Sequence, residues 1–184
     1  DNIDTPAILA DIDIVKSNIS KFQNHCNGQG LKLRPHIKTH KIPKFAKWQI
    51  EAGAVGITCQ KVSEAEAIIS EGEIKDILIT YNIIGDKKLE RLYKLSEKVK
   101  LSVVADSVQC LEGLSQRFQH GAEVLNVLIE CDTGAARCGV GSPDDTVPLV
   151  DRINQLPGLS FGGLMTYPPV GNAFAVNSFL SIAK

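Results

Sequence analysis

The chain has 184 residues, of which 43% are apolar, and its mean hydropathy is +0.00. This composition is that of an ordinary globular protein, and the length is sufficient to bury one sizeable core. The 20 Lys and Arg residues nearly balance the 21 Asp and Glu residues, which leaves a net charge of −1. No overall basic field is therefore available to hold nucleic acid or an anionic membrane surface. We also find no stretch of membrane-spanning length and no leader-like segment.

The five cysteines are an odd number and include no Cys-x-x-Cys pair. Cys59 and Cys131 lie in apolar runs, where a free thiol behaves as a small hydrophobic group. The simple interpretation is a reducing compartment, and we expect a cytoplasmic protein.

In chain order, residues 7–13 are strand-like and residues 13–26 have helical spacing, which Gly28 and Gly30 interrupt. Six β-rich runs then alternate with helical patterns: 31–38, 54–59, 77–81, 101–105, 124–131 and 161–167. Helices are expected between and after these runs over residues 43–52, 86–98 and 143–156, and a last one begins near Asn172. A further helix is opened by the capping box Ser63-Glu64-Ala65-Glu66 and closed by Gly72. Another is capped by Asp106 or Ser107 and ends near Gly121.

The repeat length is that of a βα unit, and the strands are nearly continuous apolar runs, as is typical of strands covered on both faces. The sequence therefore predicts an α/β fold with a parallel sheet or a (β/α)8 TIM-type barrel. About six barrel strands can be counted, whereas a closed barrel of this type has eight. The last residues lie inside a helical pattern, so we expect a partial barrel over residues 27–184 and a natural chain that continues past Lys184.

The densest chemical signal is the run Arg34-Pro35-His36-Ile37-Lys38-Thr39-His40-Lys41. If this run is a strand, its four even-numbered basic side chains share one face at the end of the strand where barrels carry their chemistry. A lysine that is buried among other cations loses its proton more easily and can attack an aldehyde to form a Schiff base. Taken on spacing alone, a solvated basic loop or a generic phosphate site is the simpler interpretation.

Three other motifs follow predicted strands. The segment 130–140 contains Asp132, which either orients Arg137 or caps its own loop, and capping is the simpler role. The segment 162–167 ends on Tyr167, where a tyrosine is often only packed. In the segment 56–61, Thr58 and Gln60 share a face and need hydrogen-bond partners, of which a ligand is one option.

Taken together and in this order, these motifs resemble the D-threonine aldolase and D-serine dehydratase family, which belongs to the alanine-racemase-like (fold type III) pyridoxal-phosphate enzymes. The resemblance covers nearly the whole chain. It rests on residues 34–41, Glu51-Ala52-Gly53-Ala54-Val55-Gly56-Ile57-Thr58-Cys59-Gln60-Lys61-Val62, Glu64-Ala65-Glu66, Asp132-Thr133-Gly134, Arg137-Cys138-Gly139-Val140 and Gly163-Leu164-Met165-Thr166-Tyr167.

The resemblance implies a barrel with pyridoxal 5'-phosphate at its mouth and Lys38 as the lysine that holds the cofactor. It further implies that Arg137 and Tyr167, together with His36 and Gln60, contact the cofactor. If Arg137 faces the pyridine nitrogen, that nitrogen stays unprotonated and the ring is a weaker electron sink. No metal ligand is expected among these residues. In relatives a divalent metal site lies in a carboxy-terminal β-domain, and residues 1–26 would pack with that domain.

Three functions are compatible with the resemblance. The leading one is a lyase that acts on a D-3-hydroxy amino acid, either as an aldolase or as a dehydratase. The others are an amino-acid racemase and a non-catalytic pyridoxal-phosphate carrier, and the run 34–41 argues against the carrier. After Tyr167 the chain has Pro168-Pro169-Val170-Gly171 where many relatives have Glu-Gly-His, which puts the substrate in doubt more than the cofactor. The expected partner is a small D-amino acid, with no nucleic acid and no membrane, and a homodimer is the oligomeric state considered. We expect the 184 residues alone to be inactive.

Overall fold

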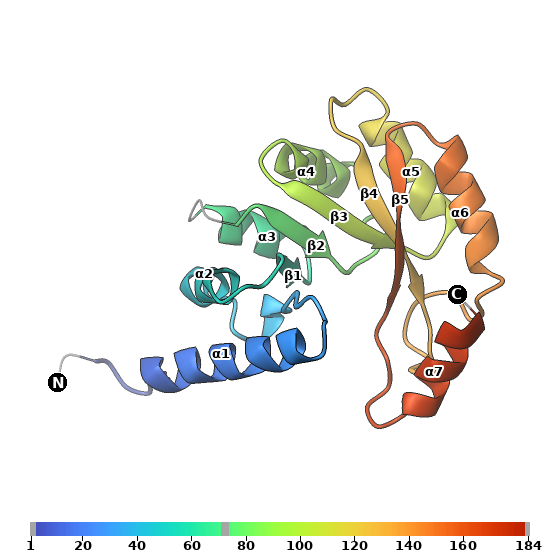
Figure 1. Ribbon diagram of the computed structural model, residues 1–184. Coiled ribbons are helices and arrows are strands. Elements are labelled where there is room, and N and C mark those ends of the chain that lie inside the picture. Colours follow the sequence, from blue (N-terminus) through green and yellow to red (C-terminus); the bar gives the residue numbers. More distant parts are fainter. Residues whose placement is uncertain (1–2, 71–73, 183–184) are drawn as a thin grey trace.

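The computed structural model describes residues 3–70 and 74–182. Its five strands form one parallel sheet in the order β1-β2-β3-β4-β5, which is also their order in the chain (Figure 1). The strands are β1 (Ile57–Cys59), β2 (Asp76–Ile79), β3 (Lys100–Ala105), β4 (Leu125–Cys131) and β5 (Leu159–Thr166). A sequential order of parallel strands joined by helices is the arrangement of a (β/α) barrel, here not closed.

The helix before β1 and the helices that connect the five strands pack on one another in a single layer. They are α2 (Pro43–Glu51), α3 (Val62–Ile69), α4 (Asp86–Ser96), α5 (Val108–Phe118) and α6 (Thr146–Gln155). Each contacts the next along the chain, and α3, α4 and α6 also contact the strands beside them. The helix α1 (Ile12–Gly28) packs on α2, and α7 (Ala173–Ile182) follows β5 (Figure 1).

The core lies between the sheet and this helical layer. Alternate strand residues point into it, because side chains in a strand alternate between its two faces. The buried strand residues include Ile57, Cys59, Ile77, Ile79, Val103, Val127 and Ile129, and the helices contribute Leu89, Leu92, Leu111, Leu114 and Phe118. The strand residues that alternate with these buried ones point to the opposite, concave face of the sheet. On that face the Asn126 amide donates a 2.9 Å hydrogen bond to Ser102 Oγ.

The predicted strand over residues 31–38 is wrong. Residues 31–36 run beside β1, held by hydrogen bonds from Val55 N to Leu33 O (2.9 Å) and from Thr58 N to Pro35 O (2.8 Å). Pro35 has no N–H to extend this pairing. A short 3₁₀ turn, η1 (Ile37–Thr39), then begins, and only His36 forms a bridge with Thr58. The sheet accordingly has five strands where six had been counted.

The strand expected over residues 7–13 is also not found. The Asp11 carboxylate accepts the N–H groups of Asp13 and Ile14 at 3.0 and 3.1 Å and so begins α1 at Ile12. The residues before it pair with no strand in the described part of the chain, and Ile8 and Leu9 are exposed.

The capping box Ser63-Glu64-Ala65-Glu66 predicted the start of α3 two residues later than the structure has it. The helix α3 begins at Val62 with Lys61 at its N-cap and has no side-chain cap, since the Glu64 carboxylate accepts the N–H of Gln60, one residue before the N-cap, at 2.8 Å. Gly72, expected to close this helix, lies outside the described residues. Of the two caps considered for α5, Ser107 is the one found, since its Oγ accepts the N–H of Cys110.

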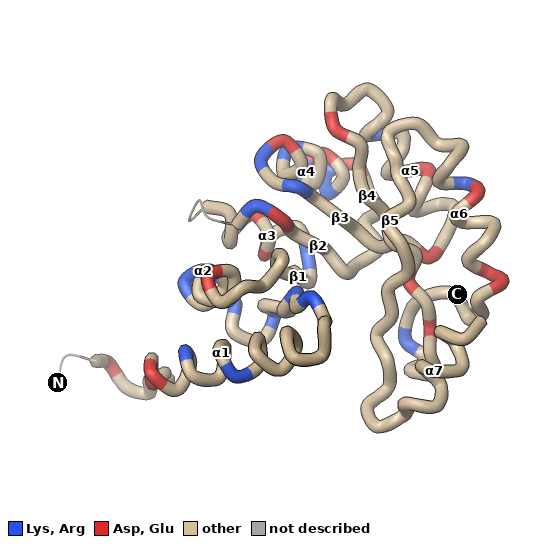
Figure 2. Tube along the Cα trace, in the orientation of Figure 1, with Lys and Arg blue, Asp and Glu red and all other residues tan. Residues whose placement is uncertain are grey.

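Both signs of charge are spread over the helices and loops, in keeping with the small net charge (Figure 2). In the part of the chain that the structure describes, no helix has the length and apolar content needed to cross a membrane.

Replacing Ile77 by alanine is expected to lower the free energy of unfolding by about 2–5 kcal/mol, because its fully buried side chain sits between β2 and the helices and its loss leaves a cavity. Denaturant unfolding followed by circular dichroism would measure the change. The control Val124→Ala alters a side chain that is 59% exposed and should shift the value by no more than about 0.5 kcal/mol. Equal effects of the two substitutions would contradict this core.

Candidate functional site

The site begins with the turn that carries Lys38. His36 precedes the turn, and its Nδ1 accepts the N–H of Lys38 at 3.3 Å. The carbonyl of Ile37 accepts the N–H groups of His40 and Lys41 at 3.2 and 2.8 Å, and the Ile37 side chain is fully buried in the core. The backbone of Lys38 is thereby held at the end of the segment that runs beside β1.

Two cations face one aromatic ring at the carboxyl ends of the strands. Tyr167 directly follows β5, and Lys38 Nζ lies 5.5 Å from the centroid of its ring. The Arg137 guanidinium carbon, from the loop after β4, lies 4.7 Å from the same centroid. Both distances are within the range of cation–π contacts. Among residues 3–70 and 74–182, no ion pair joins Lys38 or Arg137 to a carboxylate.

The loop that carries Arg137 is built by Asp132. Its Oδ1 accepts the N–H groups of Gly134, Ala135 and Ala136 at 2.8, 2.8 and 3.1 Å. The chain then returns to β4, where Asp132 N donates to Val140 O at 2.8 Å. Capping of its own loop, the simpler of the two roles considered for Asp132, is confirmed.

The return of this loop requires Gly139. Its φ is +97°, and a Cβ at this position would lie 2.7 Å from the carbonyl carbon of Cys131. Any other residue would therefore push the loop away from β4 and carry Arg137 with it.

A buried acid lies under the same loop. Glu130, near the end of β4, is 4% exposed, and Cys138 Sγ donates to its Oε1 at 3.0 Å. Burial is the main cause that raises the pKa of Glu130, and the Asp106 carboxylate adds to it, while the Cys138 thiol and the Arg137 charge oppose it. Burial and the neighbouring Glu130 raise the pKa of Cys138 to about 11, so this thiol stays protonated.

His36 is held neutral beside Lys38. Burial, and next the positive charge of Lys38, lower the pKa of its imidazole, while Glu64 and a hydrogen bond with the Thr58 backbone act in the opposite direction. Because Nδ1 accepts a hydrogen bond, the neutral ring carries its proton on Nε2, which lies 3.5 Å from Thr80 Oγ1.

The predicted common face of Arg34, His36, Lys38 and His40 is wrong, because the extended run ends at His36. Arg34 lies toward the amino ends of the strands, where its Nη1 donates to Asp76 Oδ1 at 2.7 Å. His40 lies at the start of α2, with its Nδ1 accepting the N–H of Ile42 at 3.0 Å and its ring 5.6 Å from that of Phe45. The crowding of four basic groups is therefore not observed.

The structure brings Lys38, His36, Arg137 and Tyr167 to one end of the sheet. Gln60 does not join them through any contact in the described part of the chain. Its side chain lines a separate cavity of about 260 Å³ that also contains Tyr81, Lys88 and Arg91. Arg137 is exposed in the described structure.

Sequence reasoning assigned no role in the site to Glu130, Asp106 or Thr80. The signal for Glu130 was an acidic residue inside an apolar run of seven strand residues. Asp106 and Thr80 directly follow β3 and β2, the position at which barrels place their polar groups. Within the described residues, no group of three or more His, Cys, Asp and Glu side chains could hold a metal ion.

Chemically, this end of the sheet offers an amine, a guanidinium, an aromatic ring with a hydroxyl group and a neutral imidazole. An amine can bond to an aldehyde, and two cations without carboxylate partners favour an anionic ligand. The arrangement therefore suits a small anionic molecule with a carbonyl group.

Residues 10–179 match the family of the alanine racemase N-terminal domain. The chain belongs to this family. D-threonine aldolase from Arthrobacter sp. is 37% identical over 165 residues, which are 90% of this chain and 43% of that protein. D-threo-3-hydroxyaspartate dehydratase from Delftia sp. (strain HT23) is 33% identical over 166 residues, with the same two shares.

The crystal structure of D-threonine aldolase from Filomicrobium marinum superimposes with a TM-score of 0.84 at 37% identity. The superposition covers 88% of this chain and 43% of the chain in that structure. The alanine racemase N-terminal domain is thus the fold of this chain, which spans less than half the length of the relatives that it matches.

His36 is expected to titrate below the ordinary histidine value of 6.5. The unfolded chain is then protonated at pH values where the folded protein is not. The stability that this group contributes is therefore complete above pH 6.5 and is lost as the pH falls from 6.5 toward the lowered pKa.

Nuclear magnetic resonance of the imidazole carbons, assigned with His36→Asn, would measure this titration. The Asn side chain can still accept the Lys38 N–H, so His36→Asn should keep the turn while weakening the loss of stability below pH 6.5. Titration of His36 above that value would contradict the neutral ring.

Proposed function

We propose that the protein is a pyridoxal-phosphate-dependent lyase that acts on a D-3-hydroxy amino acid, with Lys38 as the lysine that holds the cofactor. The observation that carries the proposal is the placement of Lys38 Nζ and the Arg137 guanidinium over the ring of Tyr167, at 5.5 and 4.7 Å, where the strands end. The carboxyl ends of the strands are where barrels of this kind carry their chemistry.

The chemistry of these side chains fits pyridoxal phosphate. The cofactor is an anionic aromatic aldehyde, and Lys38 can bond to its aldehyde carbon. Arg137 and Tyr167 would hold its ring or a ring substituent through a guanidinium N–H and a phenol. The bound cofactor supplies the electron sink for cleavage next to the α-carbon of the substrate.

The remaining residues serve by position and charge. His36 stays neutral behind Lys38, so it adds no second positive charge beside the amine. Gly139 and Asp132 fix the loop from which Arg137 extends. Gln60, expected to contact the cofactor, could do so only if its side chain turned away from the cavity that it lines.

The substrate class follows from the two relatives, one named for D-threonine and one for D-threo-3-hydroxyaspartate. Both names denote amino acids with a hydroxyl on the carbon next to the α-carbon. Cleavage of the bond between these carbons gives glycine and an aldehyde, whereas loss of the hydroxyl group gives, after hydrolysis, a 2-oxo acid and ammonia.

Borohydride reduction of the cofactor-loaded protein, followed by peptide mapping, is expected to place the pyridoxyl group on Lys38. The variant Lys38→Ala should carry none, and the matched variant Lys61→Ala should keep its label on Lys38. A label found on Lys41 or Lys61 in the unaltered protein would overturn the assignment.

The reaction is tested with D-threonine, D-threo-3-hydroxyaspartate and D-serine, each with and without an added divalent metal ion. We expect either glycine and an aldehyde, or a 2-oxo acid and ammonia, from at least one of them and not from its L-isomer. Interconversion of D- and L-alanine without these products would instead indicate the racemase. A Lys38 label with no turnover of any amino acid would indicate the carrier.

A further inference from the structure

The turn that carries Lys38 lies between two ion pairs. Four residues before Lys38, Arg34 Nη1 contacts Asp76 Oδ1 at 2.7 Å. Three residues after it, Lys41 Nζ contacts Glu64 Oε1 at 3.2 Å. The two carboxylates belong to different βα units, since Asp76 begins β2 and Glu64 lies in α3.

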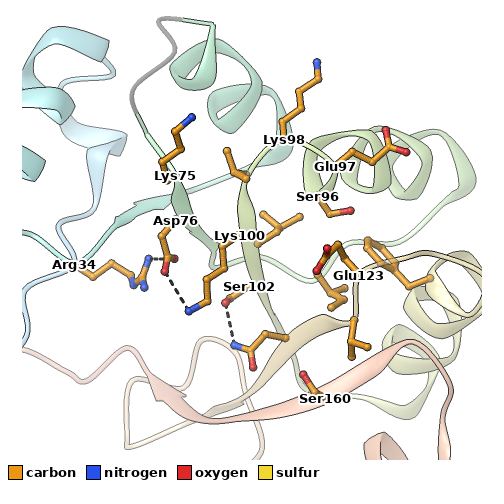
Figure 3. A pocket seen from close by; sticks show the side chains of 16 residues that line it. Arg34, Lys75, Asp76, Ser96, Glu97, Lys98, Lys100, Ser102, Glu123 and Ser160 are labelled. Carbon is orange, nitrogen blue, oxygen red and sulfur yellow. Dashed lines mark hydrogen bonds and ion pairs between the residues drawn. The ribbon is translucent and has the colours of Figure 1, made fainter.

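Asp76 joins three neighbouring segments at the amino ends of the strands, as Figure 3 shows. Its Oδ2 lies 3.6 Å from Lys100 Nζ of β3, while its Oδ1 accepts from Arg34. The side chains of Arg34 and Asp76 are 26% and 20% exposed, so this pair is partly shielded from water, whereas that of Lys100 is 76% exposed. The contact with Arg34 is therefore the stronger one.

The path of the Arg34 side chain toward Asp76 explains why position 56 is a glycine. A Cβ on Gly56 would lie 2.2 Å from Arg34 Nη1 and 2.7 Å from the carbonyl oxygen of Asp76. The guanidinium thus passes across the backbone just before β1, and only a residue without a side chain leaves room for it.

Glu64 holds the other side of the turn. Its side chain is 7% exposed, and its Oε2 also accepts the N–H of Gln60 at 2.8 Å. One carboxylate thus links Lys41 to the end of β1 and to the start of α3. Lys41 has φ +53°, a left-handed conformation that is unfavourable for a lysine and needs support from its surroundings.

These ion pairs matter because the backbone alone fixes the segment weakly. Residues 31–36 form no strand, and between residues 31 and 38 only Leu33 O and Pro35 O accept hydrogen bonds from the β1 side. These two bonds and the fully buried Ile37 side chain fix the middle of the segment. Its two ends are held through the side chains of Arg34 and Lys41, which pair with Asp76 and Glu64.

We infer that Asp76 and Glu64 are positioning residues for Lys38, which hold the segment 34–41 at both ends so that the Lys38 amine faces Tyr167. The inference rests on the proposed function, because it assumes that Lys38 binds the cofactor. Neither carboxylate lies beside the ring of Tyr167, so both act through Arg34 and Lys41.

The test uses the full-length protein loaded with pyridoxal phosphate and its variants Asp76→Asn and Glu64→Gln. Both substitutions preserve side-chain shape and remove the negative charge. We expect the rate of borohydride-trapped labelling at Lys38 to fall, and kcat to fall on the order of 10- to 100-fold with a smaller change in KM, as for a misplaced reacting group. Part of the label should move to Lys41 in Glu64→Gln, because that amine loses its partner.

The matched control is Glu66→Gln. Glu66 lies two residues along α3 and pairs with Arg91 through both carboxylate oxygens, but it has no contact with residues 34–41 in the described part of the chain. We expect this variant to label Lys38 and to turn over substrate within about two-fold of the unaltered protein, since exposed ion pairs contribute little.

The outcomes separate the two proposals. Absence of a Lys38 label in the unaltered protein overturns the proposed function. A Lys38 label that is equally fast in Asp76→Asn and Glu64→Gln overturns only the positioning role, and so does an equal loss in Glu66→Gln.

A variant that unfolds is replaced by a double variant that also removes the paired cation of the segment 34–41, namely Arg34→Met combined with Asp76→Asn, or Lys41→Met combined with Glu64→Gln. In the first of these only Lys100, whose side chain is 76% exposed, loses a carboxylate partner. If these fold with an unchanged thermal midpoint and label Lys38 at the normal rate, the positioning role is wrong. Slow labelling at an unchanged midpoint supports it, because a purely structural role would alter both. Recovery of labelling in Asp76→Glu would support it further.

Discussion

The burial of Ile37 is the contact from which the rest of the site follows. Its side chain is fully buried in the core, and its carbonyl accepts two backbone N–H groups, so the chain must turn at this residue. The turn ends the extended segment at His36 and lets the Lys38 N–H donate to the His36 imidazole. It also brings Lys38 Nζ to the ring of Tyr167.

The order of the strands supplies the second half of the site. Because all five strands are parallel and sequential, their carboxyl ends open on one side, and every loop that follows a strand begins there. Residues as far apart in sequence as Lys38 and Tyr167 meet for this reason. The loop after β4 adds Arg137, and its path depends on the three N–H groups gathered by Asp132 and on the absence of a side chain at Gly139.

Much of this arrangement could be predicted from the sequence. Apolar runs located β1 to β5 within a few residues. The basic run before β1 and the motifs after β4 and at the end of β5 drew attention to Lys38, Arg137 and Tyr167. Alternation failed at residues 31–38 because it assumes continuous pairing, whereas Pro35 and the buried Ile37 end that pairing. Glu130 was missed because its burial and its Cys138 donor depend on a loop that returns to β4. The ion pairs of Asp76 with Arg34 and of Glu64 with Lys41 join residues 42 and 23 positions apart, which local patterns cannot show.

The two ends of the sheet differ in how their cations are neutralised. At the amino ends, a hollow of about 760 Å³ contains Arg34 and Lys100, and both contact Asp76. Beside the turn, Lys41 contacts Glu64. Near Tyr167, the buried Glu130 has its pKa raised and is bound by a thiol, so it is a weak counter-charge for Arg137. Asp76 and Glu64 therefore neutralise the cations that hold the segment 34–41. The positive charge of Lys38 and Arg137, which form no ion pair among the described residues, stays available to an anionic ligand.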